Sequence, residues 1–203
     1  MKKDSFVRDA LVLTAITLIS GLLLGGAYGL TKDRIDFIKN ESTYNSYAQV
    51  MPEAKEYDDT TYADALQTAL DEGKISADNG GATLISIVAG KDDSGKEVGY
   101  IVKAKCAGFG GDDIVVVGVT SDLKITGISF PETLPETAGL GQKATEPEFY
   151  SQFAGKGTKL SVKKGGGAGE SEIDAISGAT ITSTAVTNAV NASTEFVESY
   201  IVK

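Results

Sequence analysis

The pattern of hydrophobic and polar positions divides the chain into two parts. Residues 10–31 form an uncharged apolar run, ALVLTAITLISGLLLGGAYGLT, whereas polar and apolar residues are mixed throughout the rest. A helix of this length reaches about 33 Å, enough to cross a hydrocarbon core of roughly 30 Å. A cleaved signal peptide usually has a shorter apolar region, about 7–15 residues, followed by a small-residue cleavage site that is missing here. The pattern therefore predicts an uncleaved transmembrane helix over residues 10–31.

Beyond this segment, a polar stretch through Asn45 leads to regular elements. Residues 62–70 carry apolar side chains at helical spacing, and Gly73 follows them as a stop signal, which predicts a helix. Four apolar segments with short, turn-rich connections then predict strands in antiparallel hairpins. These strands are expected at 82–89, 97–106, 113–120 and 123–130.

The C-terminal third predicts a return to helices. We expect a short helix at 147–153, a strand at 160–162 and a flexible glycine-rich loop at 163–170. The last element is an amphipathic helix that packs on the sheet. Its predicted buried face consists of Ile181, Ala185, Val186, Ala189, Val190, Phe196 and Val197. Because strands and helices are segregated along the chain, the fold class is predicted to be α+β, with a largely antiparallel sheet packed by helices.

Glycine spacing within the apolar run indicates a helix face for close packing. Gly21, Gly25 and Gly29 recur every four residues, so another transmembrane helix can approach closely along that face. Glycine is also commoner in membrane helices generally, and the sequence leaves both interpretations open. Basic residues lie on both sides of the run, so charge alone does not fix its orientation. They are Lys2, Lys3 and Arg8 before it, and Lys32, Arg34 and Lys39 after it.

Composition restricts the chemistry. With 19 Lys and Arg against 28 Asp and Glu, the net charge is -9, so the surface repels a phosphate backbone and no nucleic-acid partner is expected. The absence of His and the single Cys106 disfavour zinc sites, histidine bases, His-ligated haem and internal disulfides. Cys106 is interpreted as a buried structural thiol. We expect no metal site and no catalytic side chain, so any redox chemistry must come from a bound cofactor.

The segment Asp174-Ala175-Ile176-Ser177-Gly178-Ala179-Thr180 directly precedes the C-terminal helix. Free backbone N–H groups and the dipole at a helix N-terminus attract a phosphate, so a phosphate ester on Thr180 would lie in a favourable field. The alternative is that Ser177 or Thr180 only caps the helix through its hydroxyl.

Three motifs together resemble the FMN-binding domain family that includes the G subunit of the Rnf complex and the C subunit of the sodium-pumping NADH:quinone oxidoreductase. The family pattern Asp-x-x-Ser/Thr-Gly-Ala-Thr matches residues 174–180. The family segment Glu-Thr-Pro-Gly-Leu-Gly matches residues 136–141, with Ala138 in place of Pro. Gly-Phe/Tyr-Gly/Ser-Gly before an apolar strand matches residues 108–111. The resemblance implies that FMN is linked covalently, through a phosphoester, to Thr180.

The resemblance also implies which residues surround the cofactor. Glycines there let the backbone approach a ring or phosphate closely, although Gly139 and Gly141 are equally compatible with a tight turn. Glu136 and Thr137 can bond the ring or the ribityl hydroxyls. The predicted cofactor-binding residues besides Thr180 are Asp174, Ser177, Gly178, Ala179, Thr182, Ser183, Glu136, Thr137, Gly139, Leu140, Gly141, Phe109 and Gly110.

The function implied is that of an electron-transfer subunit in an Rnf-type complex, which couples ferredoxin:NAD+ electron transfer to ion translocation. The expected partners are the other integral membrane subunits of that complex. Because no His is present to activate Thr180, a separate FAD-dependent, magnesium-using flavin transferase should attach the FMN, with Asp174 as a recognition residue.

The expected location is the cell (inner) membrane, crossed once, with the soluble domain on the extracytoplasmic side. The expected organisation is a cytoplasmic N-terminus over 1–9, the transmembrane helix over 10–31, a helical stalk and connector over 32–80, and the FMN-binding domain over 81–203. The alternatives are a stand-alone flavinylated extracytoplasmic electron carrier, the C subunit of the sodium-pumping enzyme, and an unmodified extracytoplasmic binding or scaffold domain.

Overall fold

The computed structural model of the protein describes residues 3–202, and their side chains except at 3–7, 30 and 33–37. Residues 1 and 2 of the predicted N-terminal segment, and residue 203 of the predicted FMN-binding domain, lie outside the described residues. The chain forms two compact units, Met1–Glu41 and Ser42–Lys203, which are described separately.

The first unit is a single helical stretch. It belongs to helix α1, Lys3–Val50, whose segment Arg8–Gly29 has a mean hydropathy of 2.1 and no buried side chain. An apolar helix without a protein partner is stable where the surrounding solvent is also apolar, so this segment is the candidate membrane anchor. A Cβ added at Gly21, Gly25 or Gly29 would have no other atom within 4 Å. Among the described residues of this unit, none packs against the glycine face.

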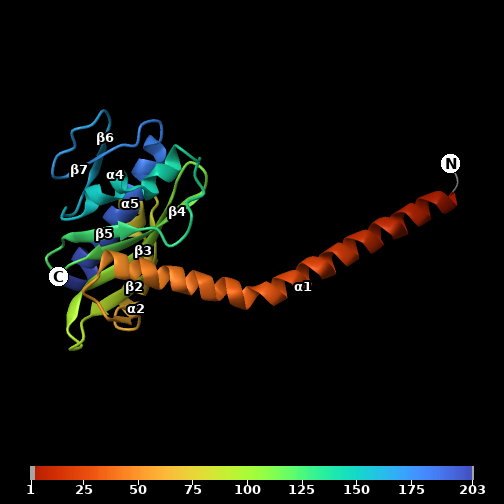
Figure 1. Ribbon diagram of the computed structural model, residues 1–203, viewed down its shortest axis with the longest axis horizontal. Coiled ribbons are helices and arrows are strands. Elements are labelled where there is room, and N and C mark those ends of the chain that lie inside the picture. The colour runs from red at the N-terminus through yellow and green to blue at the C-terminus, as the bar shows by residue number, and fades with distance from the viewer. Residues whose placement is uncertain (1–2, 203) are drawn as a thin grey trace. The chain divides into compact units, whose positions relative to one another are not determined.

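The second unit is built on one five-stranded antiparallel sheet. Its strands follow chain order from β1 to β5, and β2 to β5 are labelled in Figure 1. The four strands predicted from the sequence are present, because each apolar run is joined to the next by a tight turn. In the turn after β2, for example, the Asp92 carboxylate accepts the Ser94 N–H at 2.8 Å. The strands are β1 Glu56–Asp58, β2 Thr83–Lys91, β3 Glu97–Ala107, β4 Asp112–Val119 and β5 Ile125–Ser129.

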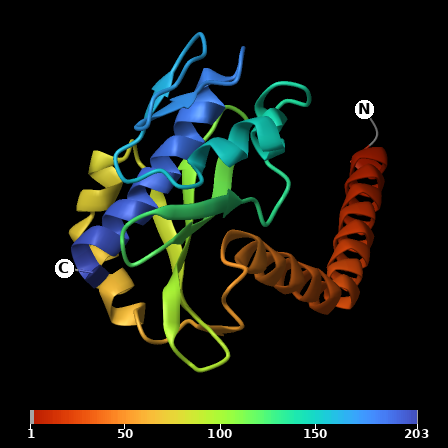
Figure 2. The same ribbon diagram turned by 60° about the vertical axis from the view of Figure 1, so that its left-hand side comes forward.

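Three helices cover one face of the sheet. They are α2 (Ala63–Glu72), α3 (Lys74–Asp78) and α5 (Thr180–Phe196), which continues as a π-helical segment, Val197–Val202. Figure 2 shows α5 lying along the sheet. Its apolar side chains meet the inward face of β3 and β4, and the core between them is closed by fully buried Phe153 and Phe196.

The opposite face of the sheet is also covered, by the end of α1. Tyr47 and Val50 pack there against Val88, Ile101 and Val116. Burial on both faces explains why residues 114–119 of β4 form a continuous run without polar alternation. The sequence predicts a stalk and connector over residues 32–80, whereas residues 42–80 belong to the compact unit that contains the sheet.

Shorter elements complete the unit between β5 and α5. They are η1 (Gly141–Thr145), α4 (Pro147–Tyr150), η2 (Ser151–Phe153), β6 (Ser161–Lys163) and β7 (Glu172–Asp174). The two last strands pair in parallel and flank the glycine-rich loop. The predicted short helix and strand are found, and β7 is an additional strand. The unit is an α+β domain, as the segregation of strands and helices predicts.

Candidate functional site

The three motif segments, which are far apart in the sequence, meet around one cavity. This cavity has a volume of about 320 Å³ and receives side chains or backbone from all three segments. Pockets of this size and above are typical of small-molecule sites. It is lined by Phe109, Glu136, Thr137, Leu140, Gly141, Gly178, Ala179, Thr180, Ile181 and Thr182.

The N-terminus of α5 forms one wall of the cavity. Ala179 is the capping residue, Thr180 is the first helical residue, and no side-chain hydrogen bond caps the helix. The alternative in which Ser177 or Thr180 acts as the cap is therefore not observed. The first N–H groups of a helix have no intrahelical acceptor, so this wall presents backbone donors and the positive end of the helix dipole.

A tight turn places Thr180 at this position. Gly178 has a φ of 79°, a conformation that disfavours a side chain, and a Cβ there would stand 3.3 Å from Leu140 Cδ2. Ser183 locks the same turn from inside. Its buried hydroxyl accepts the Ile176 N–H and donates to the Ala179 carbonyl, both at 3.0 Å. Ser183 thus supports the turn, and the cavity wall does not include it.

Glu136 connects the segment 108–111 to the segment 136–141 through hydrogen bonds. It is 7% exposed, and its Oε1 accepts the backbone N–H groups of Phe109 at 2.7 Å and Gly110 at 3.4 Å. Gly110 packs so closely that a Cβ would lie 1.7 Å from the Pro135 carbonyl oxygen. The turn at 108–111 and the loop at 131–141 are consequently fixed to each other.

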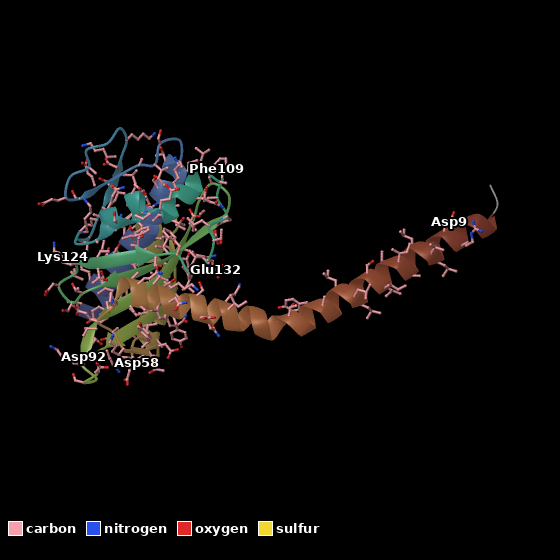
Figure 3. The ribbon with its side chains drawn as sticks, viewed as in Figure 1. Asp9, Asp58, Asp92, Phe109, Lys124 and Glu132 are labelled. Carbon is pink, nitrogen blue, oxygen red and sulfur yellow. The ribbon has the colours of Figure 1, made fainter. Side chains whose placement is uncertain are left out.

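The rim of the cavity is apolar. Phe109, Leu140 and Ile181 are exposed by 70%, 44% and 56%, and Figure 3 shows Phe109 at the periphery of the domain. Helical spacing predicts Ile181 on the buried face of the last helix, but this residue lies in the first turn, beyond the edge of the core, and lines the cavity instead. In the sequence, the position of Ile181 directly after the motif is the signal that could have placed it at the cavity. Three exposed apolar side chains suit a planar aromatic ligand.

Four further predicted residues lie near the site but do not line the cavity: Asp174, Ser177, Gly139 and Gly110. Asp174 is engaged elsewhere, because its Oδ1 accepts the Ala168 N–H at 2.9 Å and its backbone N–H donates to Gln152 Oε1 at 2.7 Å. Asp174 thereby fixes the glycine-rich loop. Contact of any of the predicted residues with FMN stays a prediction.

Thr180 also lines a second cavity of about 240 Å³ beside the first turn of α5. Its walls include Cys106, Thr184 and Asn188. Cys106 is buried, and burial raises the pKa of its thiol, which fits the interpretation as a neutral structural residue. Within the described residues, no hydrogen bond engages the Thr180 hydroxyl, so it is available between the two cavities.

The surroundings of the first cavity are acidic. Asp113 is fully buried behind Glu136, and burial, together with the negative charge of Glu136, raises the pKa of Asp113 to about 7. Sequence reasoning missed this residue, because nothing local distinguishes it from its exposed neighbour Asp112. Among the described residues, no group of His, Cys, Asp and Glu has the arrangement of a metal site.

A larger, open cleft of about 820 Å³ lies elsewhere on the unit. It runs between Ser42 and Gln49 near the end of α1 and the residues that follow β5, and contains none of the three motifs. The smaller cavity is the candidate site because the motifs converge there.

Comparison with known proteins identifies the same region. Residues 108–195 match the model of the FMN-binding domain family. The chain is 33% identical, over 90% of its length and 87% of the relative, to the G subunit of the Na(+)-translocating ferredoxin:NAD(+) oxidoreductase complex of Acetobacterium woodii. It is 29% identical to the G subunit of the ion-translocating oxidoreductase complex of Methanosarcina acetivorans, over 91% of this chain and 90% of that protein.

A solved structure shares the fold. The crystal structure of Shewanella oneidensis NqrC superposes with a TM-score of 0.50 at 28% identity, covering 57% of this chain and 58% of that one. The cavity, its helix N-terminus and its apolar rim suit a flavin phosphate and ring, in agreement with the family match. The chain therefore belongs to the FMN-binding domain family, as a membrane-associated electron-transfer subunit of the type found as the G subunit of ion-translocating oxidoreductase (Rnf) complexes.

Proposed function

We propose that Thr180 carries FMN through a phosphoester bond and that the chain relays electrons within a ferredoxin:NAD+ oxidoreductase complex coupled to ion translocation. The observation that supports this proposal best is the Thr180 hydroxyl, which has no hydrogen bond to any described residue and lines both cavities at a helix N-terminus without a side-chain cap. The soluble unit is proposed to lie on the extracytoplasmic side of the membrane.

The residues of the cavity divide into three roles in this proposal. The first backbone N–H groups of α5 would hold the phosphate, whose charge the helix dipole favours. Phe109, Leu140 and Ile181 would cover the ring and exclude water from it, because they form the apolar rim. Thr137 and Thr182 supply hydroxyls on the walls for the polar groups of the ligand.

The bound flavin would supply the redox chemistry, since it accepts electrons from one carrier and passes them to the next. The protein contributes position and electrostatics. Glu136 places negative charge beside the cavity, which opposes the addition of an electron there and lowers the tendency of the site to be reduced.

Attachment requires a second protein in this proposal. A hydroxyl with an ordinary pKa needs a base to become a nucleophile, and the chain has no His. Glu136 lines the same cavity, but its Oε1 is already bound by two backbone N–H groups. A transferase that uses FAD would form the Thr180 O–P bond and release AMP, as the family resemblance implies.

Membership of a complex is supported by the names of both relatives, each the G subunit of an ion-translocating oxidoreductase. The open glycine face of α1 offers a surface for an integral membrane partner. Co-purification in mild detergent from the native source tests this part, and isolation of the chain alone would remove the support for it.

The covalent bond is tested by the intact mass of the chain purified from its native source. We expect the mass of one FMN, less one water, on the wild-type chain, and no added mass on Thr180→Ala. Thr184→Ala is the matched control, because Thr184 is an exposed hydroxyl residue one helical turn later and should leave the modification intact. Flavin that persists covalently on Thr180→Ala would contradict the proposal.

A further inference from the structure

A buried carboxyl without a partner lies behind the wall of the cofactor cavity. Asp113, in β4, has an exposed fraction of 0%, and neither of its carboxyl oxygens has a hydrogen-bond partner among the described residues. A buried polar group of this kind costs free energy unless it finds a donor or acceptor. A proton on the Asp113 carboxyl, donated to a neighbouring acceptor, would remove this cost.

Glu136 is the group that faces Asp113. A Cβ placed on Gly108 would stand 2.3 Å from Asp113 Oδ2 and 2.4 Å from Glu136 Oε1. Both oxygens therefore lie close to the position that a side chain of residue 108 would occupy. Any side chain at position 108 would push the two carboxyl groups apart.

The two carboxyl groups differ in their other contacts. Glu136 accepts two backbone N–H groups, from Phe109 and Gly110. Asp113 has no such donor among the described residues. Two buried carboxylates in contact cannot both stay ionised at low cost, so a single proton belongs on Asp113, which then donates to Glu136.

The remaining neighbours of Asp113 do not neutralise it. Cys106, its register partner on β3, is a buried thiol, and the side chain that approaches this thiol from α5 is the uncharged Asn188. Asp112, on the same strand, is exposed and forms an ion pair with Lys105 at 2.6 Å. Among the ion pairs of the described residues, none involves Asp113 or Glu136. Because no cation of the described residues pairs with them, a proton is the group that would neutralise one of the two carboxylates.

We propose that Asp113 and Glu136 bind one proton between them behind the cofactor cavity, and that their affinity for this proton rises when negative charge enters the cavity. The first half concerns the chain alone, whereas the second half rests on the proposed flavin at Thr180. Because Glu136 lines the cavity and also interacts with the Asp113 side chain, it connects the charge of the ligand to the proton.

Electron and proton movements are linked at this pair. If the preceding carrier of the complex passed an electron to a flavin in the cavity, a proton from water would form an O–H bond with the Asp113 carboxylate. When the electron moves on, the proton returns to water. The net charge of the site then changes less than the electron alone would change it, which eases electron transfer at the pH where the pair titrates.

Infrared spectroscopy of the full-length chain in detergent tests the first half. The unloaded Thr180→Ala protein should show the carbonyl stretch of a protonated carboxyl group that disappears with a midpoint near pH 7. The band should be absent from Thr180→Ala/Asp113→Asn and retained in Thr180→Ala/Asp112→Asn, since Asp112 is exposed and already paired. Aspartate labelled with ¹³C at its carboxyl carbon assigns the band to Asp rather than Glu.

Two results would overturn the first half: no such band above pH 5.5, or a band that survives in the Asp113→Asn protein. Circular dichroism of each variant shows whether it is folded. Asn at position 113 keeps a neutral donor of the same shape, so loss of the band together with native ellipticity identifies the proton and excludes unfolding as the cause.

The flavin-loaded wild-type protein tests the second half. We expect its titration midpoint to lie about one pH unit above that of the Thr180→Ala protein, because phosphate and flavin add negative charge. If mass spectrometry shows no flavin and the band is unchanged, the proposed function fails while the proton pair stands. If flavin is present and the midpoint does not move, the coupling is refuted.

Discussion

At the residue scale, Thr180 differs from the hydroxyl residues farther along its helix that donate to helical carbonyls. Thr187 and Ser193 donate hydrogen bonds to carbonyls one turn earlier, at 2.8 Å each. Thr180 is the first residue of α5, so no helical carbonyl stands one turn before it. Its position at the start of the helix therefore keeps its hydroxyl available.

Also at this scale, Asp113 should make the stability of the protein depend on pH. Its pKa is about 7 in the folded chain against 3.8 for an ordinary Asp, so the folded state holds the proton more tightly than the unfolded state. The resulting stabilisation is fully present below pH 3.8 and is lost as the pH rises through about 7. As the pH rises, the wild-type protein should lose this stabilisation. Asp113→Asn should not, because Asn has no carboxyl group to titrate.

Denaturant unfolding of both proteins in mild detergent measures this difference. We expect the advantage of Asp113→Asn to grow between about pH 4 and pH 7, and to level off on the order of 2–4 kcal/mol above that range. Asp112→Asn should behave like wild type apart from the loss of an exposed ion pair. A constant difference between wild type and Asp113→Asn at all pH values would contradict this assignment.

At the element scale, the glycine turn at 108–111 fits the loop at 131–141 because Gly110 has no side chain at their contact. A Cβ on Gly110 would meet a backbone carbonyl, which cannot rotate away as a flexible side chain can. The same contact sets the hydrogen bonds to Glu136, so the loop position and the cavity wall depend on it.

Gly110→Ala should therefore separate the two segments. We expect a loss of about 1–3 kcal/mol in the free energy of unfolding and a reduced flavin content in the purified protein. Gly157→Ala is the matched control, since a Cβ there would have no atom within 4 Å. Denaturation curves and the flavin-to-protein absorbance ratio measure both effects, and equal behaviour of the two variants would show that the contact is unimportant.

Elements stabilised by local pattern were predictable, and those stabilised by distant contacts were not. The four long strands are recognisable as apolar runs between turns. By contrast, β1 has three residues, two of them acidic, and β7 exists through its parallel pairing with β6. The sequence predicts a stalk and connector at the end of α1, because its polar residues hide the side that packs on the sheet. Only contacts with the sheet, such as those of Tyr47, identify that side.

The site follows the same rule. The three motifs are recognisable because each is a short run with its own glycines, and the structure brings members of all three to one cavity. The Asp113–Glu136 contact joins residues of different segments, and neither segment carries a pattern that indicates it. Ile181 was misplaced because helical periodicity continues through the first turn, whereas the core does not.

At the scale of the whole molecule, the single buried cysteine makes the side of the membrane measurable. Cys106 is 4% exposed, so an impermeant maleimide should label the wild-type chain poorly in intact cells. Asp93→Cys adds a thiol in the exposed turn after β2 and should be labelled strongly if the soluble unit is extracytoplasmic. Labelling that appears only after cell lysis would place this unit in the cytoplasm.

Helix α5 has a consequence for biogenesis. The residue proposed to receive the flavin stands at one end of the same helix that fills the core with Val186, Val190 and Phe196. In the folded chain, the position of Thr180 depends on the burial of these side chains and on the turn that Ser183 holds through its hydrogen bonds. A transferase that requires this geometry would distinguish mature chains from unfolded ones, so flavin loading would record that the domain had already folded.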